Sequence, residues 1–169
     1  MKDFYNLFVN ELKRIYSAEK QIAAALPKLA NAASSPKLKK AINHHLEETK
    51  VQIKRLEAIA SEIDEKLSGL ECQIMKNLLK EAADVGKFHY DRMAKDAALI
   101  HAVQRIEHYE IAAYGTLKAF AKQFKLKEVE KLLDHSAKEE SHADKTLSKI
   151  AEGQFFKSGI NTEACKRCA

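Results

Sequence analysis

Hydrophobic residues recur at spacings of three and four along most of this chain, a pattern typical of amphipathic α-helices. The spacing predicts four long helices and one short helix. The long ones are expected over residues 3–33, 36–67, 91–124 and 126–152, and the short one over 71–85. Strands separated by frequent turns are not expected, because the sequence has only 5 Gly and 2 Pro. The chain is therefore predicted to be all-α.

A few residues mark the expected helix boundaries. In the Ser-Ser-Pro sequence after the first helix, Ser35 is expected to be the N-cap and Pro36 the first helical residue. Pro27 is expected to kink the last turns of the first helix. Gly69 and Gly86 are expected to end the second long helix and the short helix.

The segment between the second and third long helices indicates the topology. Helices of roughly 30 residues span about 45 Å, and residues 67–93 are numerous enough to return that distance. One long crossover between the second and third long helices is the ferritin-like arrangement. We therefore predict a ferritin-like four-helix bundle over residues 1–152 and a flexible C-terminal tail over 153–169.

A weak internal repeat supports two related helical hairpins. Adding 91 to a position in the first half gives a similar residue in the second, so that Glu19 corresponds to Glu110 and Glu48 to Glu139. One offset serves both helix pairs and matches four acids.

Each long helix carries a glutamate near the middle of its predicted buried face. These acids are Glu19, Glu48, Glu110 and Glu139. Four ionised carboxylates in one core need a counter-charge, and the predicted buried faces contain no lysine or arginine. Two divalent metal ions would supply the charge, because they accept glutamate oxygens and share bridging carboxylates. The alternative is that these glutamates are rotated toward solvent.

Known dinuclear bundles place one Glu on each of two helices and Glu-x-x-His on each of the other two. Glu139 and His142 form this motif, whereas His45 and Glu48 present it in reverse. Both orders put the two side chains on one helical face, since three residues make nearly one turn. Glu107, three residues before Glu110, is expected to face the same site, as a ligand or as a residue that orients one.

Tyrosines flank the acids at positions 16, 109 and 114. A tyrosine beside a redox metal donates a hydrogen bond or an electron. Its alternative role is that of a core aromatic residue whose hydroxyl is hydrogen-bonded.

These residues resemble a known family, the YciE/YciF-type ferritin-like stress proteins of bacteria. The matching stretches lie at 16–21, 25–28, 45–49, 52–56, 72–75, 96–100, 107–117, and 139–140 with Asp144. The most specific is Glu107-His-Tyr-Glu-Ile-Ala-Ala-Tyr-Gly-Thr-Leu117. The resemblance covers about residues 3–152 and implies a four-helix bundle, a homodimer and a dinuclear metal site.

The family pattern selects a set of candidate metal ligands. They are Glu19, His45, Glu48, Glu107, Glu110, Glu139 and Glu140. Glu140 is one step from Glu139 and could replace it, because helix rotation is uncertain from sequence. His142 departs from the family, which usually has a small residue there. It is either a ligand or a surface histidine. Asp144 is expected to lie outside the ligand set.

Charge and cysteine usage exclude other classes. The net charge of +5 comes from interspersed residues without a basic block, so no nucleic-acid partner is expected. No apolar stretch is long enough to span a membrane. The cysteines Cys72, Cys165 and Cys168, an odd set, favour a reducing cytoplasm. The Cys165–Cys168 pair is either part of a loose tail or an intersubunit metal or disulfide site.

The leading hypothesis is a cytoplasmic homodimer that binds two divalent ions, iron or manganese, and either reacts with oxygen or peroxide or handles the metal itself. The alternative is a non-catalytic dimeric scaffold of the stress response. A cage-type ferritin is a weaker third option. Sequence alone does not decide whether the protein is an enzyme.

Overall fold

The structure is a computed structural model that describes residues 2–154 and 157–166. Its elements are α1 (Lys2–Ala32), α2 (Pro36–Glu62), α3 (Gln73–Asp84), the 3₁₀ turn η1 (Val85–Lys87), α4 (Arg92–Gln123), α5 (Lys127–Glu152), β1 (Gly153–Gln154), β2 (Lys157–Ser158) and α6 (Ile160–Lys166). The two short strands pair antiparallel, with Gly153 opposite Ser158.

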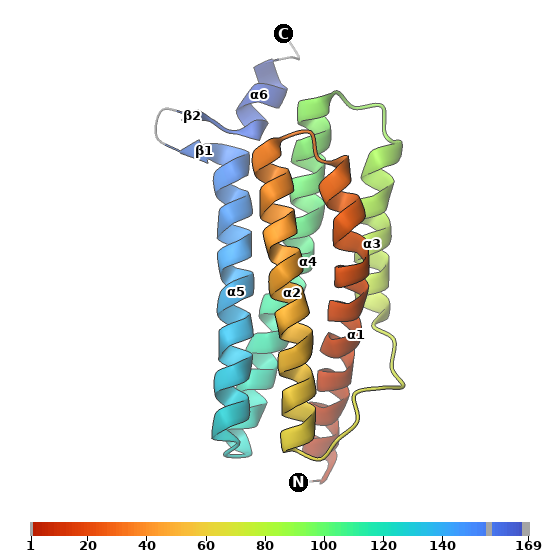
Figure 1. Ribbon diagram of the computed structural model, residues 1–169, viewed down its shortest axis with the longest axis vertical. Helices are drawn as coiled ribbons and strands as arrows, with labels where there is room; N and C mark the ends of the chain where they lie inside the picture. The colour runs from red at the N-terminus through yellow and green to blue at the C-terminus, as the bar shows by residue number, and fades with distance from the viewer. Residues whose placement is uncertain (1, 155–156, 167–169) are drawn as a thin grey trace.

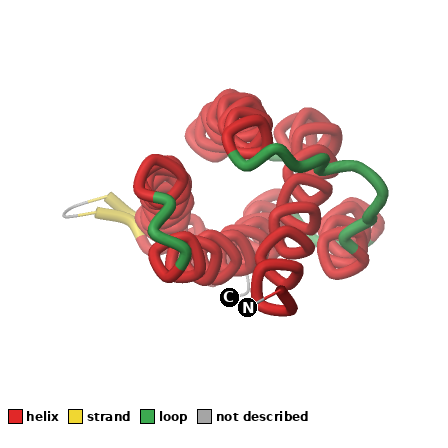
Figure 2. The backbone as a smooth tube through the Cα atoms, turned by 90° about the horizontal axis from the view of Figure 1, so that it is seen from below, coloured by secondary structure: helices red, strands yellow, loops and turns green. Residues whose placement is uncertain are grey.

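The four long helices α1, α2, α4 and α5 form one bundle with a ferritin-like path. In Figure 1, α1 and α5 run upward and α2 and α4 run downward. After α2 the chain crosses the lower end of the bundle, and α3 returns it to the top along α1 and α4. The view along the bundle in Figure 2 shows the connecting segments at the ends and outside of the bundle. The predicted all-α bundle with one long crossover is confirmed.

The first helix boundaries follow the expected chemistry. Ser35 is the N-cap of α2 and accepts a hydrogen bond from the Leu38 backbone N–H, with Pro36 as the first helical residue. α1 continues through Pro27 to Ala32. Ser34 and Ser35 also donate their backbone N–H groups to the two carboxylate oxygens of Asp96, at 2.8 and 2.7 Å. This buried aspartate therefore joins the α1–α2 turn to α4.

The second long helix ends earlier than expected, at Glu62 instead of residue 67. Asp64 has a φ of 53°, and the backbone N–H of Glu65 donates to the carbonyl of Ala60 at 2.9 Å. This is a helix stop in which the left-handed residue is an aspartate instead of the usual glycine. α4 ends in the same way, with Lys125 at a φ of 59° and a bond from Leu126 to Ala121.

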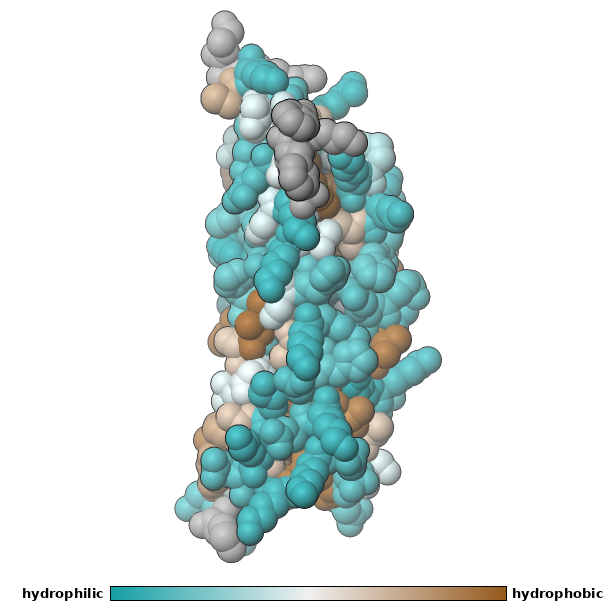
Figure 3. Space-filling view, turned by 90° about the vertical axis from the view of Figure 1, so that its left-hand side faces the viewer, coloured by the Kyte–Doolittle hydropathy of each residue, from teal (hydrophilic) through white to brown (hydrophobic). Residues whose placement is uncertain are grey.

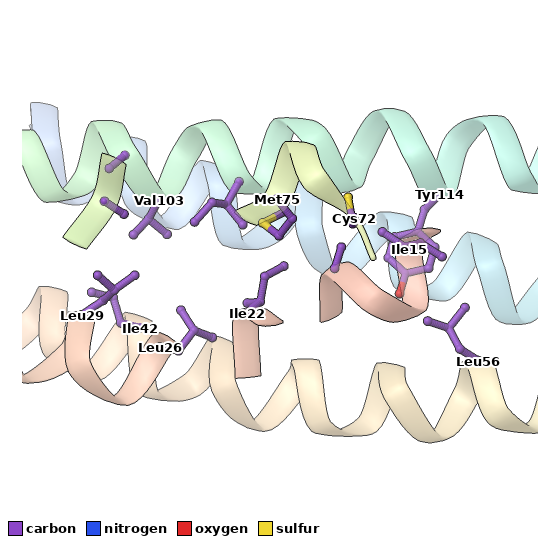
Figure 4. Close-up of a cluster of buried hydrophobic side chains, with 14 of the residues drawn as sticks. Ile15, Ile22, Leu26, Leu29, Ile42, Leu56, Cys72, Met75, Val103 and Tyr114 are labelled. Carbon is purple, nitrogen blue, oxygen red and sulfur yellow. The ribbon is translucent and has the colours of Figure 1, made fainter. Parts of the chain in front are cut away.

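The hydrophobic core fills the space between the long helices. Figure 4 shows Ile22 and Leu26 of α1 on the side toward Met75 of α3 and Val103 of α4. Ile15 of α1 lies beside Tyr114 of α4 in the same view, and all six side chains are fully or nearly fully buried. The surface over α5, shown in Figure 3, is mostly hydrophilic with small separate hydrophobic patches. None of the described helices has an apolar stretch long enough to cross a membrane.

The segment after α5 closes one end of the bundle. The β1–β2 hairpin leads into α6, which packs against α4 and α5. Gly159 allows this approach, because a Cβ atom there would lie 2.3 Å from the Ala151 carbonyl oxygen. The flexibility expected for residues 153–169 stays a prediction.

Candidate metal centre

One group of buried side chains brings acids and a histidine together inside the bundle. α2 supplies His45, α4 supplies Glu107 and Glu110, and α5 supplies Glu140. One potential ligand atom from each lies within 4.8 Å of the others. His45 is 3% exposed and the three glutamates are 0% exposed. Side chains from three different helices thus meet in the core, away from water.

His45 lies at the middle of this group. Its Nε2 atom is 3.4 Å from Glu107 Oε1 and 3.8 Å from Glu110 Oε2. Its Nδ1 atom is 3.7 Å from Glu140 Oε2. Both ring nitrogens therefore face carboxylates, one on each side of the imidazole.

Most polar atoms of the group lack hydrogen-bond partners among the described residues. The buried atoms without one include both ring nitrogens of His45, both carboxylate oxygens of Glu107 and of Glu110, and Oε2 of Glu140. A buried polar group without a partner costs about 1–3 kcal/mol, and more when it is charged. Imidazole and carboxylate are ligands for divalent first-row metals. The group could therefore hold a metal ion, which would give these atoms a partner.

Burial sets the protonation of the group. Burial, followed by the charge of His44, lowers the pKa of His45 to about 4, so its ring is neutral at pH 7. Burial raises the pKa of Glu140 to about 7. Burial, and then the charge of Glu140, raises the pKa of Glu107 and Glu110 well above the ordinary value. Metal binding must therefore displace protons from the carboxyls.

Because the carboxyl pKa values are raised in the folded state, the stability of the metal-free protein is expected to depend on pH. A carboxyl whose pKa is higher in the folded state loses its proton first in the unfolded state, so stability falls as pH rises between the two pKa values. His45 acts in the opposite sense but only below its ordinary pKa of 6.5. Above pH 6.5, therefore, the carboxyls alone act.

We expect the free energy of unfolding of the metal-free protein to fall between pH 6.5 and 8.5. The fall is about 1.4 kcal/mol per pH unit for each carboxyl that is protonated in the folded state and ionised in the unfolded state. Chemical denaturation in a chelator at several pH values measures this. A stability that rises across that interval would contradict the raised carboxyl pKa values.

Glu19 borders the group and is held by a buried tyrosine. Tyr114 donates its hydroxyl hydrogen bond to Glu19 Oε1, whereas Glu19 Oε2 has no hydrogen-bond partner. Both side chains are 0% exposed. The charge of Glu19 contributes to the raised pKa of Glu110. Tyr114 thus has a hydrogen-bonded hydroxyl, the core role that the sequence left open.

Glu48 lies at the edge of the group, with its side chain 19% exposed. Its Oε2 atom is 4.0 Å from His45 Nδ1, and its Oε1 atom is 3.4 Å from the exposed ring of His44. The reversed motif therefore does put His45 and Glu48 on one side of α2. Glu48 remains a predicted ligand.

Glu139 points to a different partner. Arg55 Nη1 and Nη2 donate to the two Glu139 oxygens at 2.8 and 3.1 Å, and Arg55 Nη1 also donates to Ser136 Oγ. Although burial acts to raise the pKa of Glu139, the hydrogen bonds and charge of Arg55 lower it below its ordinary value. The buried face of α5 contains Glu140, so the helix is rotated by one residue from the predicted face.

Two features of this region were missed from sequence. Arg55 is only 9% exposed in its side chain, so a basic residue does contribute a counter-charge beside the core. Gln52 Nε2 donates to Glu140 Oε1 and to Glu139 Oε2, and so joins the two adjacent acids. The sequence signal that could have revealed this contact was Gln52 itself, a glutamine on the buried face of α2.

The remaining candidates lie outside the group. His142 is exposed. Asp144 accepts a hydrogen bond from Gln104 at 2.9 Å and lies 3.3 Å from His108. Cys165 is an exposed free cysteine on α6, and Cys168 lies outside the described residues.

Comparison with known proteins identifies relatives over nearly the whole chain. The family pattern that matches residues 3–164 is described as a domain of unknown function, DUF892. Protein YciF of Escherichia coli strain K12 is 41% identical over 162 residues, covering 95% of this chain and 98% of YciF.

Solved structures agree with the fold. The crystal structure of the E. coli stress protein YciF matches with a TM-score of 0.85 and 42% identity, over 89% of this chain and 95% of that one. YcfI of Rhodopseudomonas palustris, described as a candidate structural protein, matches with a TM-score of 0.84 and 37% identity, over 88% and 94%. A Xanthomonas campestris protein at 18% identity and a TM-score of 0.74, covering 97% of each chain, shares the fold. The chain therefore belongs to the DUF892 family and is similar along nearly its whole length to the bacterial stress protein YciF.

Proposed function

We propose that this protein is a ferritin-like stress protein whose core binds two divalent metal ions, iron or manganese, and reacts with oxygen or peroxide or handles the metal itself. The observation that supports this proposal is the buried group formed by His45, Glu107, Glu110 and Glu140, whose inward atoms lack hydrogen-bond partners among the described residues. Buried carboxylates without a counter-charge are otherwise costly.

The chain's own residues divide the work of such a site. His45, Glu107, Glu110 and Glu140 would hold metal, with Glu19 and Glu48 bordering them as ligands for a second ion. Bound redox-active ions would polarise a small oxidant and exchange electrons with it. Gln52 holds Glu140 Oε1 and leaves Oε2 facing His45, while Tyr114 holds Glu19 Oε1. These two donors orient carboxylates in the way that outer residues orient metal ligands.

Metal analysis followed by a turnover assay tests the proposal. Protein purified without chelators is expected to contain about two iron or manganese ions per chain, following the known dinuclear bundles. Protein loaded with the metal in its reduced, divalent state is expected to consume hydrogen peroxide or oxygen as the metal is oxidised, whereas protein stripped with a chelator is not. A preparation that takes up neither metal would contradict the proposal.

A non-catalytic scaffold is the second candidate, favoured by the description of the relative YcfI as a candidate structural protein. Both proposals expect a homodimer in the cytoplasm. The scaffold proposal predicts that the protein stays folded and dimeric without metal and leaves peroxide unchanged. Metal content and peroxide consumption, measured on the same preparation, separate the two.

A further inference from the structure

A small cavity connects the surface between α2 and α5 with the buried group. Its lining changes from exposed to buried along its depth. His44 and His142 are exposed at its mouth, whereas His45 and Glu107 are buried at its inner end. The cavity therefore reaches two of the side chains that could hold metal.

Most of the exposed wall of this cavity is apolar, although Glu48 and Thr146 also line it. Ile42, Val103 and Leu147 are nearly fully buried along it, and the small side chains Ala41 and Ala143 leave the space open. Its volume is about 30 Å³. That is room for about two water-sized groups, since one such probe occupies about 10–15 Å³. A molecule with two heavy atoms fits, whereas a bulky organic peroxide does not.

Polar atoms lie at the inner end of the cavity. The ring nitrogens of His45 and the carboxylate oxygens of Glu107 have no hydrogen-bond partner among the described residues. An occupant would therefore travel along an apolar wall and stop beside polar atoms that are free to interact. A hydrated cation that moved from Glu48 past the apolar side chains would lose part of its water shell there, which is unfavourable. An uncharged apolar diatomic molecule meets no such cost.

We propose that this cavity is a dioxygen-binding site that admits oxygen from the surface between α2 and α5 to His45 and Glu107. The proposal rests on the proposed function and deepens it, because it names the oxidant and its route.

Paramagnetic relaxation by dissolved oxygen tests the site in the metal-free protein, so the result does not depend on metal loading. Under oxygen pressure, the methyl protons of Ile42, Val103 and Leu147 are expected to relax several-fold faster than those of Leu12 and Ile22. The latter two are 0% exposed elsewhere in the core. Equal enhancement at both sets would overturn the proposal.

A variant that fills the cavity tests the assignment against a matched variant elsewhere. Ala143→Val is expected to reduce the oxygen enhancement at the three lining methyls severalfold. Ala113→Val makes the same change in a separate groove beside Leu7 and Ile74 and is expected to leave it unchanged. If Ala143→Val fails to fold, Ala41→Val tests the same wall. An enhancement that survives filling of the wall would contradict the assignment.

Metal content separates this proposal from the one on which it rests. If the wild type takes up no metal yet shows the oxygen enhancement, the cavity assignment stands and the dinuclear function fails. If the wild type binds metal but shows no enhancement, the cavity assignment alone fails.

Discussion

Replacing Glu107 and Glu110 together by glutamine is expected to abolish metal binding in the core and to stabilise the metal-free protein. Glutamine keeps the shape of each side chain but carries no charge, so it cannot replace a carboxylate ligand. Both glutamates are 0% exposed, and their oxygens lack hydrogen-bond partners among the described residues. Above its ordinary pKa, each of these carboxyls lowers the stability of the metal-free protein by about 1.4 kcal/mol per pH unit, and glutamine removes that cost.

The stability gain is expected to grow with pH. Burial raises the pKa of both carboxyls, so the wild type pays an increasing cost above their ordinary pKa, which the variant avoids. Denaturation at pH 6.5 and 8.5 in a chelator measures the difference, and metal analysis measures the loss of binding. Glu47→Gln, on a glutamate whose side chain is 67% exposed, is the control and is expected to change neither quantity. A double variant that keeps its metal would remove these glutamates from the ligand set.

Replacing Arg55 by methionine is expected to destabilise the protein by about 2–4 kcal/mol, because it leaves a partly buried carboxylate without its counter-charge. Arg55 makes two hydrogen bonds to Glu139, with side chains 9% and 18% exposed. Adding Glu139→Gln to Arg55→Met is expected to recover much of the loss, since the uncompensated charge is then gone. Urea denaturation of the four proteins of this cycle measures the coupling.

The same variants test the role of Glu139. If Glu139 serves Arg55 and not a metal ion, Glu139→Gln keeps the metal content of the wild type while Glu140→Gln lowers it. Arg14→Met is the matched stability control, because the Arg14–Glu11 pair has side chains 47% and 35% exposed. Exposed pairs contribute about 0–1 kcal/mol. A destabilisation by Arg55→Met that Glu139→Gln does not relieve would indicate lost packing of the arginine stem instead.

Much of this architecture was predictable because helical spacing is a local property. The spacing of apolar residues predicted the four long helices, and Ser35 and Pro36 located the restart between the first two. The early end of α2 was missed because Asp64 adopts the left-handed conformation that was expected of a glycine. A helix stop of this kind depends on backbone bonds that apolar spacing does not report.

The type of site was predictable from the sequence, but the identity of every residue in it was not. Glutamates and a histidine on the predicted buried faces pointed to Glu19, His45 and Glu110, which all lie in the core. A rotation of one residue separates Glu139 from Glu140, and the packing of α5 against its neighbours settles it. Arg55 was missed because its partner is on another helix, 84 residues away in the chain.

Anomalous scattering from crystals of protein purified without chelators, measured at the iron and manganese edges, tests the central claim most directly. We expect strong peaks within the group of His45, Glu107, Glu110 and Glu140, with carboxylate oxygens at bonding distance. A well-ordered bundle with no peak at that position, or with metal only at surface sites, would contradict it.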